Sequence, residues 1–200
     1  MSNKNLTTQD KSRYILAITG ASGVIYAKTL IEYFYKNKLP LTCLVSHIGE
    51  KVWEWEIGSS ISETLPSEIA IYFENDWWSP VASGSVKAKA MVIMPCSMGT
   101  LAAIAHGLAK NVIIRVADVM LKEKRPLILV PRETPLNIIH LKNMLTLAEA
   151  GATILPAMPG FYHKPNTVQA LVNFVVARVL DHLGLVHNLM QSWEELFKQS

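Results

Sequence analysis

An arginine and a glutamate lie side by side in the short turn Pro131-Arg132-Glu133-Thr134-Pro135, directly after an apolar segment. Turns favour polar residues, so this pair alone is compatible with either a solvated loop or a ligand site. The arginine could bind a phosphate through paired hydrogen bonds, and the glutamate could orient a neighbouring base or carry a proton. Other polar or charged residues near this turn would favour a ligand site over a solvated loop.

Two further turns combine glycine with small hydroxyl side chains, GASG at residues 20–23 and CSMGT at residues 96–100. Both precede a helical pattern, and the free N–H groups at a helix start attract an anion. GASG is not the dinucleotide fingerprint GxGxxG, because it lacks the third glycine and an acidic residue about 20 positions on. The phosphate of a mononucleotide such as FMN fits it better, although a turn that binds nothing stays open as the alternative.

Basic side chains elsewhere in the chain could complete a phosphate site. Arg115 and Lys122 are expected on the helix that follows the CSMGT turn, and Arg178 is expected on the last helix. Gathered in one pocket with Arg132, they would bind a phosphate or pyrophosphate through charge-assisted bonds. Taken singly, each is equally compatible with a solvated surface.

Aromatic side chains stand in unusually polar surroundings, as in WEWE (residues 53–56), NDWW (residues 75–78), PGFYHKP (residues 159–165) and QSW, which ends at Trp193. Core packing is the usual role of a tryptophan. An electron-rich pocket can also stabilise a carbocation by cation–π attraction, which would be a chemical use for such rings.

Charge and histidine spacing argue against several other functions. The 19 Lys and Arg against 16 Asp and Glu give a net charge of +3, and the basic residues are scattered, so we expect no nucleic-acid partner. The six histidines show no spacing typical of metal ligands, so we expect no metal site.

Cysteine usage and the N-terminal sequence predict a reduced, cytoplasmic protein. Cys43 and Cys96 lie far apart, and we interpret Cys96 as a buried structural residue rather than a nucleophile. The first residues lack the apolar core of a signal peptide. The 20 uncharged residues between Lys89 and Lys110 are long enough to cross a bilayer, but Pro95 and the small-residue turn divide them, so we expect no membrane span.

The elements that would position these residues alternate between strand and helix. Apolar strands are expected at residues 14–19, 41–46, 90–95 and 126–131, with a shorter strand at 152–155. Helices are expected from about residue 24, after residue 46, from residue 100, over 137–150 and over 167–183. Nearly continuous apolar strands are buried on both faces, so the pattern predicts a parallel sheet in a three-layer α/β/α domain.

We expect one domain over residues 1–200, with a flexible N-terminus at 1–12, a surface connection at 58–67 and a C-terminal tail or lid at 184–200. An apolar content of 50% with only 18% charged residues indicates that part of the surface is buried between subunits. In an open parallel sheet the ligand crevice lies outside the carboxyl ends of the strands. Ser22, Ser46, Ser97, Arg132 and Glu133 all fall at that edge.

These motifs resemble those of the UbiX-type flavin prenyltransferase family from about residue 14 to residue 193. The resemblance rests on ITGASG, NDW, SGS at residues 83–85, PCSMGTLAAIA, ADVMLKEKRPLILVPRETP, HLKNM, PGFYHKP and FVVARVLDHLG. Two positions depart from the family pattern: Met98 stands where threonine is common, and His47 stands where lysine is expected.

The resemblance implies a flavodoxin-like, Rossmann-like parallel sheet and a dodecamer whose active sites lie between subunits. It implies transfer of a dimethylallyl group from dimethylallyl monophosphate to N5 and C6 of reduced FMN, without a metal. The prenylated FMN would serve a partner decarboxylase of the ubiquinone or aromatic-acid type.

The resemblance also assigns roles residue by residue. The implied FMN contacts are Gly20, Ala21, Ser22, Ser46, Ser97, Met98, Gly99, Thr100 and Arg132. The implied prenyl-phosphate site comprises Arg115, Lys122, Glu133, Tyr162 and Arg178, with Trp193 in a C-terminal lid. Ser22 and Glu56 would assist phosphate departure and proton transfer, and Trp77 would lie over the prenyl chain. Arg115, Lys122 and Glu133 would also take part in catalysis.

Two functions of other classes stay open. A flavin-dependent cysteine decarboxylase would need a Pro-x-Met-Asn-type motif, which is missing, and a catalytic histidine after the second strand, for which His47 is the only candidate. A non-catalytic FMN carrier would need the flavin site but not the five residues of the prenyl-phosphate site. Their joint presence favours the enzyme.

Overall fold

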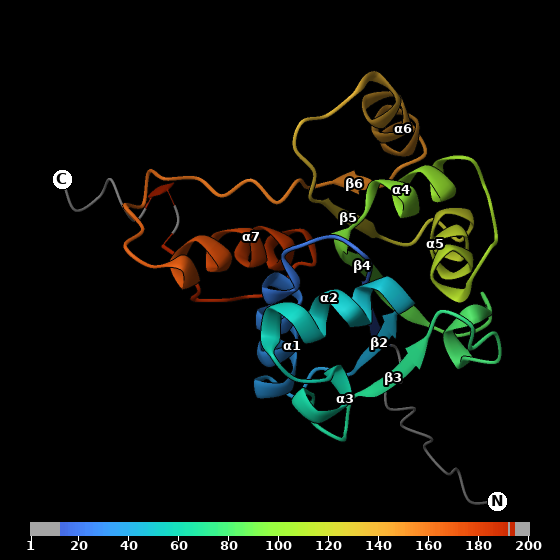
Figure 1. Cartoon of the computed structure of the whole chain (residues 1–200), viewed down its shortest axis with the longest axis horizontal. Coiled ribbons are helices and arrows are strands. Elements are labelled where there is room, and N and C mark those ends of the chain that lie inside the picture. Colours follow the sequence, from blue (N-terminus) through green and yellow to red (C-terminus); the bar gives the residue numbers. More distant parts are fainter. Residues whose placement is uncertain (1–12, 192, 195–200) are drawn as a thin grey trace, which may run out of the picture.

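Six strands form one parallel sheet in the order β3-β2-β1-β4-β5-β6 (Figure 1). The computed structural model describes residues 13–191, 193 and 194, so the predicted flexible N-terminus lies outside the described residues. The strands are β1 (Arg13–Ile18), β2 (Leu41–Val45), β3 (Ala70–Phe73), β4 (Ala88–Cys96), β5 (Leu127–Pro131) and β6 (Thr153–Ile154). The strand order reverses between β1 and β4, and such a reversal opens a ligand crevice in α/β sheets.

Helices cover both faces of this sheet, which confirms the predicted three-layer α/β/α architecture. They are α1 (Val24–Lys36), α2 (His47–Ile57), α3 (Ile61–Thr64), α4 (Met98–Ala105), α5 (Val112–Lys122), α6 (Ile138–Glu149) and α7 (Val168–His182), with a 3₁₀ turn η1 (Pro80–Ala82). One core cluster joins α1, α2 and α7 to the sheet, and a second joins α4, α5 and α6 to its other face. None of the described helices has the length and apolar character to cross a membrane.

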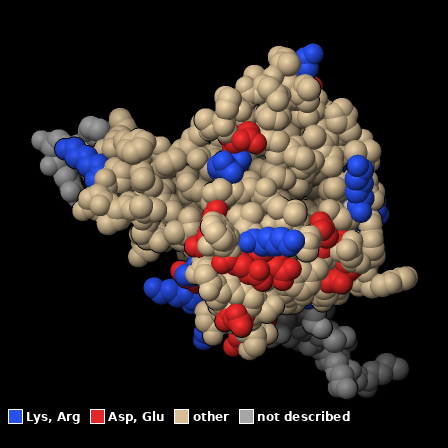
Figure 2. Space-filling view, in the orientation of Figure 1, with Lys and Arg blue, Asp and Glu red and all other residues tan. Residues whose placement is uncertain are grey.

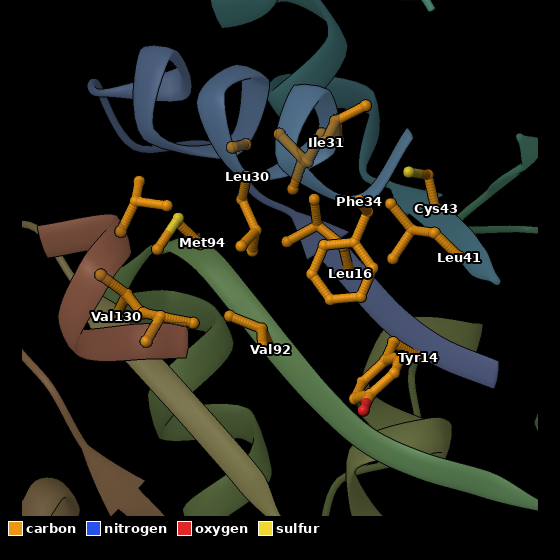
Figure 3. Packing of buried hydrophobic residues seen from close by; sticks show 14 of the residues in the cluster. Tyr14, Leu16, Leu30, Ile31, Phe34, Leu41, Cys43, Val92, Met94 and Val130 are labelled. Atoms are coloured by element: carbon orange, nitrogen blue, oxygen red, sulfur yellow. The ribbon is translucent and has the colours of Figure 1, made fainter. Parts of the chain in front are cut away.

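The core explains why the strands read as continuous apolar runs. Alternate residues of β1 enter opposite clusters: Leu16 packs with α1, and Ile15 belongs to the cluster of α4 and α5. Figure 3 shows Leu16 in one cluster with Phe34 of α1 and Val92 of β4. Each fully buried side chain of this size stabilises the fold by about 1.5–3 kcal/mol. The two helix layers are therefore fixed to the sheet, and the loops at its carboxyl edge start from a rigid base.

The main differences from the expected elements concern β3, α3 and α5. Strand β3 was not expected, because all its residues are half-exposed at the edge of the sheet and form no apolar run. The expected surface connection at 58–67 contains helix α3, whose start is a capping box between Ser60 and Glu63. Arg115 and Lys122 lie on α5, a separate helix from α4, which directly follows the CSMGT turn.

Candidate active site

The carboxyl ends of β1 and β4 meet at the reversal of strand order, and Thr19 joins them. Its hydroxyl donates to the Pro95 carbonyl at 2.8 Å and accepts from the Ser97 N–H at 2.8 Å. Thr19 is 1% exposed, so these two bonds are shielded from water. Thr19 therefore fixes the spacing of the GASG and CSMGT turns. Sequence reasoning did not assign it a role, although the residue stands directly before the glycine loop.

The GASG turn presents backbone N–H groups at the start of α1. Gly23 has a φ of 104°, which favours glycine, and its N–H and that of Val24 donate to the Glu56 carboxylate at 3.0–3.1 Å. Glu56 reaches the turn from the last turn of α2. Since a carboxylate satisfies these groups, the start of α1 has the geometry and field to hold an anion such as a phosphate.

Two glycines allow α2 to approach the sheet closely enough for this contact. A Cβ on Gly20 would lie 2.5 Å from Ile48 Cγ2, and a Cβ on Gly49 would lie 2.5 Å from the Ile18 carbonyl oxygen. Neither distance is sterically possible without movement of the chain. Gly49 was not among the predicted site residues, and nothing in its local sequence distinguishes it from an ordinary helix glycine.

Arg132 extends from the end of β5 to the same turn. Its Nε donates to the Ser22 carbonyl at 3.2 Å. Ser22, Glu56 and Arg132, which come from different elements, therefore meet at the GASG turn. The neighbouring Glu133 is half-buried, and its carboxylate accepts from the Thr134 N–H at 3.1 Å, so it supports its own turn.

Two of the predicted flavin-contact serines cap helices at this edge. Ser46 accepts from the Gly49 N–H at 2.9 Å and begins α2. Ser97 accepts from the Thr100 N–H at 3.3 Å and donates to the Thr100 hydroxyl at 3.0 Å, which begins α4 two residues earlier than expected. These caps satisfy backbone N–H groups at the starts of both helices, which follow directly after β2 and β4.

Glu74, which the sequence analysis did not identify, connects three elements beside the site. Its carboxylate accepts from the His47 N–H at 3.1 Å and from Asn111 Nδ2 at 3.2 Å. Its own carbonyl accepts from the Val112 N–H at 2.9 Å. The end of β3 is therefore tied to the starts of α2 and α5.

The basic residues of α5 form ion pairs, and Lys122 lies beside the SGS turn. Arg115 pairs with Asp118 at 3.0 Å, and Lys122 pairs with Glu123 at 2.8 Å. The hydrogen bond and charge of Lys122 lower the pKa of the Glu123 carboxyl. A Cβ on Gly84 would lie 3.4 Å from Lys122 Nζ, so the backbone of the turn and this ammonium group face one another.

Arg125 holds the SGS turn in this position. Its two terminal nitrogens donate to the Val86 carbonyl at 2.7 Å and to the Gly84 carbonyl at 2.8 Å. The hydroxyls of Ser83 and Ser85 lie 2.9 Å apart in the same turn. Hydroxyls next to an ammonium group offer several donors to a phosphate.

Three other predicted substrate residues meet at the far end of the molecule. Tyr162, Arg178 and Trp193 line a cavity of about 610 Å³. The rings of Tyr162 and Trp193 are 4.9 Å apart in an edge-to-face arrangement. The segments around α7 project from the sheet on the left of Figure 1, whereas α5 lies on the right. A single chain therefore does not bring Tyr162 and Arg178 to Arg115 and Lys122.

The tryptophans divide between core and surface. Trp53 is fully buried, whereas Trp55 and Trp78 are almost fully exposed. Trp77 is 44% exposed in the turn after β3, and its backbone N–H donates to the Asn75 carbonyl at 2.9 Å. The core reading is therefore correct for Trp53. Trp77 faces solvent in this chain, where a ligand or another subunit could reach it.

Among the described residues, the cysteines, the potential metal ligands and the surface charges each bear on whether another kind of site is present. Burial raises the pKa of the Cys43 and Cys96 thiols to about 12, which keeps both protonated and agrees with a structural role for Cys96. No group of three potential metal ligands occurs within them. Figure 2 shows Lys and Arg side chains scattered over one face, often beside Asp and Glu. Such a surface offers single charges to a small anion rather than a continuous stripe to a polyanion.

Comparisons with known proteins bear on the same site. The flavoprotein family model matches residues 2–180. A flavin prenyltransferase UbiX from Methanocaldococcus jannaschii is 46% identical over 181 residues, which cover 90% of this chain and 98% of that relative. The crystal structure of AnUbiX (PadA1) in complex with FMN and dimethylallyl pyrophosphate has a TM-score of 0.87 and 38% identity, covering 91% of this chain and 97% of that one. A dodecameric FMN-dependent Ubix-like decarboxylase from Escherichia coli O157:H7 has the same TM-score and identity, covering 90% and 98%.

Proposed function

The chain belongs to the flavoprotein family, among the UbiX-type flavin prenyltransferases, and from this membership we propose its reaction in detail. It is an FMN-binding prenyltransferase. The proposed reaction transfers the dimethylallyl group of dimethylallyl monophosphate to N5 and C6 of reduced FMN. The product would be the cofactor of a partner decarboxylase of the ubiquinone or aromatic-acid type, and the reaction would take place in the cytoplasm.

The observation that carries the proposal is the meeting of Glu56 and Arg132 at the GASG turn. Glu56 accepts from the Gly23 and Val24 N–H groups, and Arg132 donates to the Ser22 carbonyl. This arrangement places an anion site, a carboxylate and a guanidinium at the reversal of strand order. A turn that binds nothing would not need a charged residue from α2 and another from the loop after β5.

The residues at this edge suit FMN. The proposed flavin contacts are Gly20, Ala21, Ser22, Ser46, Ser97, Met98, Gly99, Thr100 and Arg132. Met98 is buried at the start of α4, and Gly99 beside it is exposed, so this helix start can approach a ligand through its backbone. Reduced FMN supplies a nucleophilic nitrogen and an aromatic carbon to the reaction.

The prenyl phosphate would be bound by residues from more than one chain. Arg115, Lys122 and Glu133 would come from one subunit, and Tyr162, Arg178 and Trp193 from a neighbour. The AnUbiX complex with FMN and dimethylallyl pyrophosphate supports a donor of this class. The separation of α5 and α7 in one chain supports a site between subunits.

We also propose that the assembly is a dodecamer. Helix α6 exposes four large apolar side chains, which soluble monomers seldom place side by side. They are Ile138, Ile139, Leu141 and Leu145. A second copy covering this helix would remove them from water, and the dodecameric relative from Escherichia coli supports an assembly of that size.

The charges of the site suit loss of phosphate from an allylic carbon. When the C–O bond breaks, the electron pair leaves with the phosphate, where Arg115, Lys122 and Arg178 would stabilise the charge. Trp77 would stabilise positive character on the prenyl group as the bond to N5 forms, and the proton of N5 would leave with the released phosphate. These cations would supply the positive charge that a metal supplies in other prenyl-transfer enzymes.

Closing the second bond at C6 requires a group that both gives and accepts a proton. One proton adds to the remaining prenyl double bond, and one leaves C6. Glu56, or the released phosphate, would serve this purpose, and Ser22 would assist departure of the phosphate. Glu133 would keep the phosphate-binding side chains oriented.

The test is anaerobic incubation of the purified protein with reduced FMN and dimethylallyl monophosphate, followed by mass spectrometry of the extracted flavin. A gain of one prenyl unit is expected. A parallel reaction with dimethylallyl diphosphate compares the two donors, and added chelator should leave the yield unchanged. Unmodified flavin from protein that binds FMN would instead favour the carrier or a different flavin chemistry.

A further inference from the structure

The end of α7 carries a polar network that the sequence analysis did not identify. Arg178 Nη1 donates to one oxygen of Asp181 at 2.5 Å, and His187 Nε2 lies 2.9 Å from the other. Because an ionised carboxylate only accepts hydrogen bonds, the His187 ring must carry a proton on Nε2. The Asp181 carboxylate is therefore held from both sides.

His187 is the buried member of this network. Its side chain is 9% exposed, against 42% for Asp181 and 48% for Arg178. Its second ring nitrogen, Nδ1, is buried and has no hydrogen-bond partner among the described residues. Burying an unpaired polar atom costs free energy, so packing alone would favour an apolar residue here. The contact that offsets this cost is the one with Asp181.

The backbone around His187 is anchored independently of Asp181. The chain turns back after α7, and the Tyr33 hydroxyl on α1 donates to the Val186 carbonyl at 2.7 Å. Leu185 and Leu189 pack against the core cluster of α1 and α7. The ring of His187 is thus placed by the body of the protein rather than by the exposed arginine.

We propose that His187 is a positioning residue: it holds the Asp181 carboxylate, which in turn fixes the Arg178 guanidinium in the orientation that receives the phosphate of the prenyl donor. This inference rests on the proposed function, which assigns that phosphate to Arg178. The contact with Asp181 uses one of the five N–H groups of the guanidinium, so the others can bind phosphate oxygens. Tyr162 and Trp193 line the same cavity beside Arg178.

The test compares three variants of the full-length, FMN-loaded enzyme. His187→Leu removes the donor and keeps a buried side chain of similar bulk, and His187→Gln retains an N–H donor. His182→Leu is the matched control, because this histidine lies nearby, in the last turn of α7, but is exposed. We expect His187→Leu to raise the KM for dimethylallyl monophosphate about tenfold, with kcat within about threefold and FMN affinity unchanged. His187→Gln should restore most of the affinity, and His182→Leu should match the wild type.

A double variant tests whether the effect passes through the arginine. If His187 acts on Arg178, adding His187→Leu to Arg178→Ala should raise the KM no further than Arg178→Ala alone. Additive effects would overturn the proposal, as would a wild-type KM in folded His187→Leu. Should that variant fail to fold, Tyr33→Phe loosens the same segment elsewhere, and an unchanged KM there would overturn the proposal equally.

Titration of dimethylallyl monophosphate into the oxidised, FMN-loaded protein separates this inference from the proposed function. A wild-type protein that does not bind the donor would end the proposed function, and this inference with it. A wild type that binds the donor, next to a His187→Leu variant that binds it equally well, would end this inference alone. If the wild type binds the donor and His187→Leu binds it about tenfold more weakly, this inference is supported.

Discussion

The carboxyl edge of the sheet and the end of α7 both carry charged side chains, but only the first forms a closed set of contacts within one chain. At the sheet edge, Thr19 is fully buried, and Glu56 and Arg132 each bond to backbone groups of the GASG turn. At the end of α7, Arg178 and Asp181 are about half-exposed and bond mainly to one another and to His187.

This difference supports the proposal that the sheet edge binds the flavin and that the end of α7 binds the phosphate. Bonds to the backbone of the GASG turn fix the positions of Glu56 and Arg132 without a second subunit, which suits the binding of a rigid flavin. The half-exposed Arg178–Asp181 pair lies beside a cavity of about 610 Å³ and leaves N–H donors available. This suits a prenyl-donor phosphate that residues of another subunit also bind. The sheet edge should therefore tolerate little change, and the end of α7 should act only in the assembled oligomer.

The largest effect is expected from Glu56→Gln at the sheet edge. The amide keeps the size of the side chain but cannot take a proton, and it offers a weaker acceptor to the Gly23 and Val24 N–H groups. We expect kcat to fall by about 10²–10⁴-fold, the range for a lost general acid or base. Glu54→Gln, on the exposed face of the same helix, should retain full turnover. Turnover near wild type in both variants would assign the proton transfer to the released phosphate.

Mixing two variants tests whether the sheet edge and the end of α7 of different chains form one site. Arg132→Ala impairs the sheet edge and Arg178→Ala impairs the end of α7, so each variant alone should be poorly active. If every site takes one region from each of two chains, co-assembly at equal amounts should restore about a quarter of the wild-type activity, since that share of random pairings has both regions intact. Mixing after assembly, without exchange of subunits, is the control. No recovery in co-assembled oligomers would place both regions in the same chain's site.

Much of the fold was predictable because buried parallel strands have a strong sequence signal. The runs that became β1, β2, β4 and β5 are apolar on both faces, and each ends in a turn of glycine, serine or proline. Strand β3 was missed because its half-exposed residues at the sheet edge carry no such run. Its helical neighbour α3 was missed as well, although Ser60 and Glu63 have capping-box spacing.

The parts of the candidate site that lie in turns with a local sequence motif were predictable. The parts that depend on hydrogen bonds between residues far apart in the sequence were not. GASG and the Arg132-Glu133 pair have local signals. Thr19 and Glu74 act through partners 27 to 78 positions away, as in the hydrogen bonds of Thr19 to Ser97 and of Glu74 to His47. His187 acts from the segment that folds back after α7. No local pattern encodes such pairings, because they depend on strand order, on where α2 begins and on how the chain folds back after α7.

Thr19→Val tests the rigidity of the sheet edge with a smaller effect. Valine keeps the shape but leaves the Ser97 N–H and the Pro95 carbonyl without the side-chain partner. We expect the free energy of unfolding to fall by about 2 kcal/mol and FMN affinity by about tenfold. Thr19→Ser, which keeps the hydroxyl, should lie close to the wild type in both. A loss in Thr19→Ser next to a Thr19→Val variant close to the wild type would attribute the effect to the methyl group instead of the hydroxyl. The measurements are denaturant unfolding and flavin fluorescence.

The smallest effect is expected at Cys96, which lies at the sheet edge but should take no part in the chemistry. Burial raises the pKa of its thiol to about 12, from about 9 in an unfolded chain, and Cys43 in the middle of β2 behaves alike. The folded protein should therefore resist iodoacetamide at pH 8, and Cys96→Ala should keep turnover within about threefold, since no thiolate is available as a nucleophile. Because the pKa is raised on folding, both thiols favour the folded state below about pH 9 and destabilise it as the pH rises further and the unfolded chain ionises first. Rapid labelling of the native protein, or a loss of turnover as large as that expected for Glu56→Gln, would place a reactive thiol at this edge and reopen the nucleophile reading.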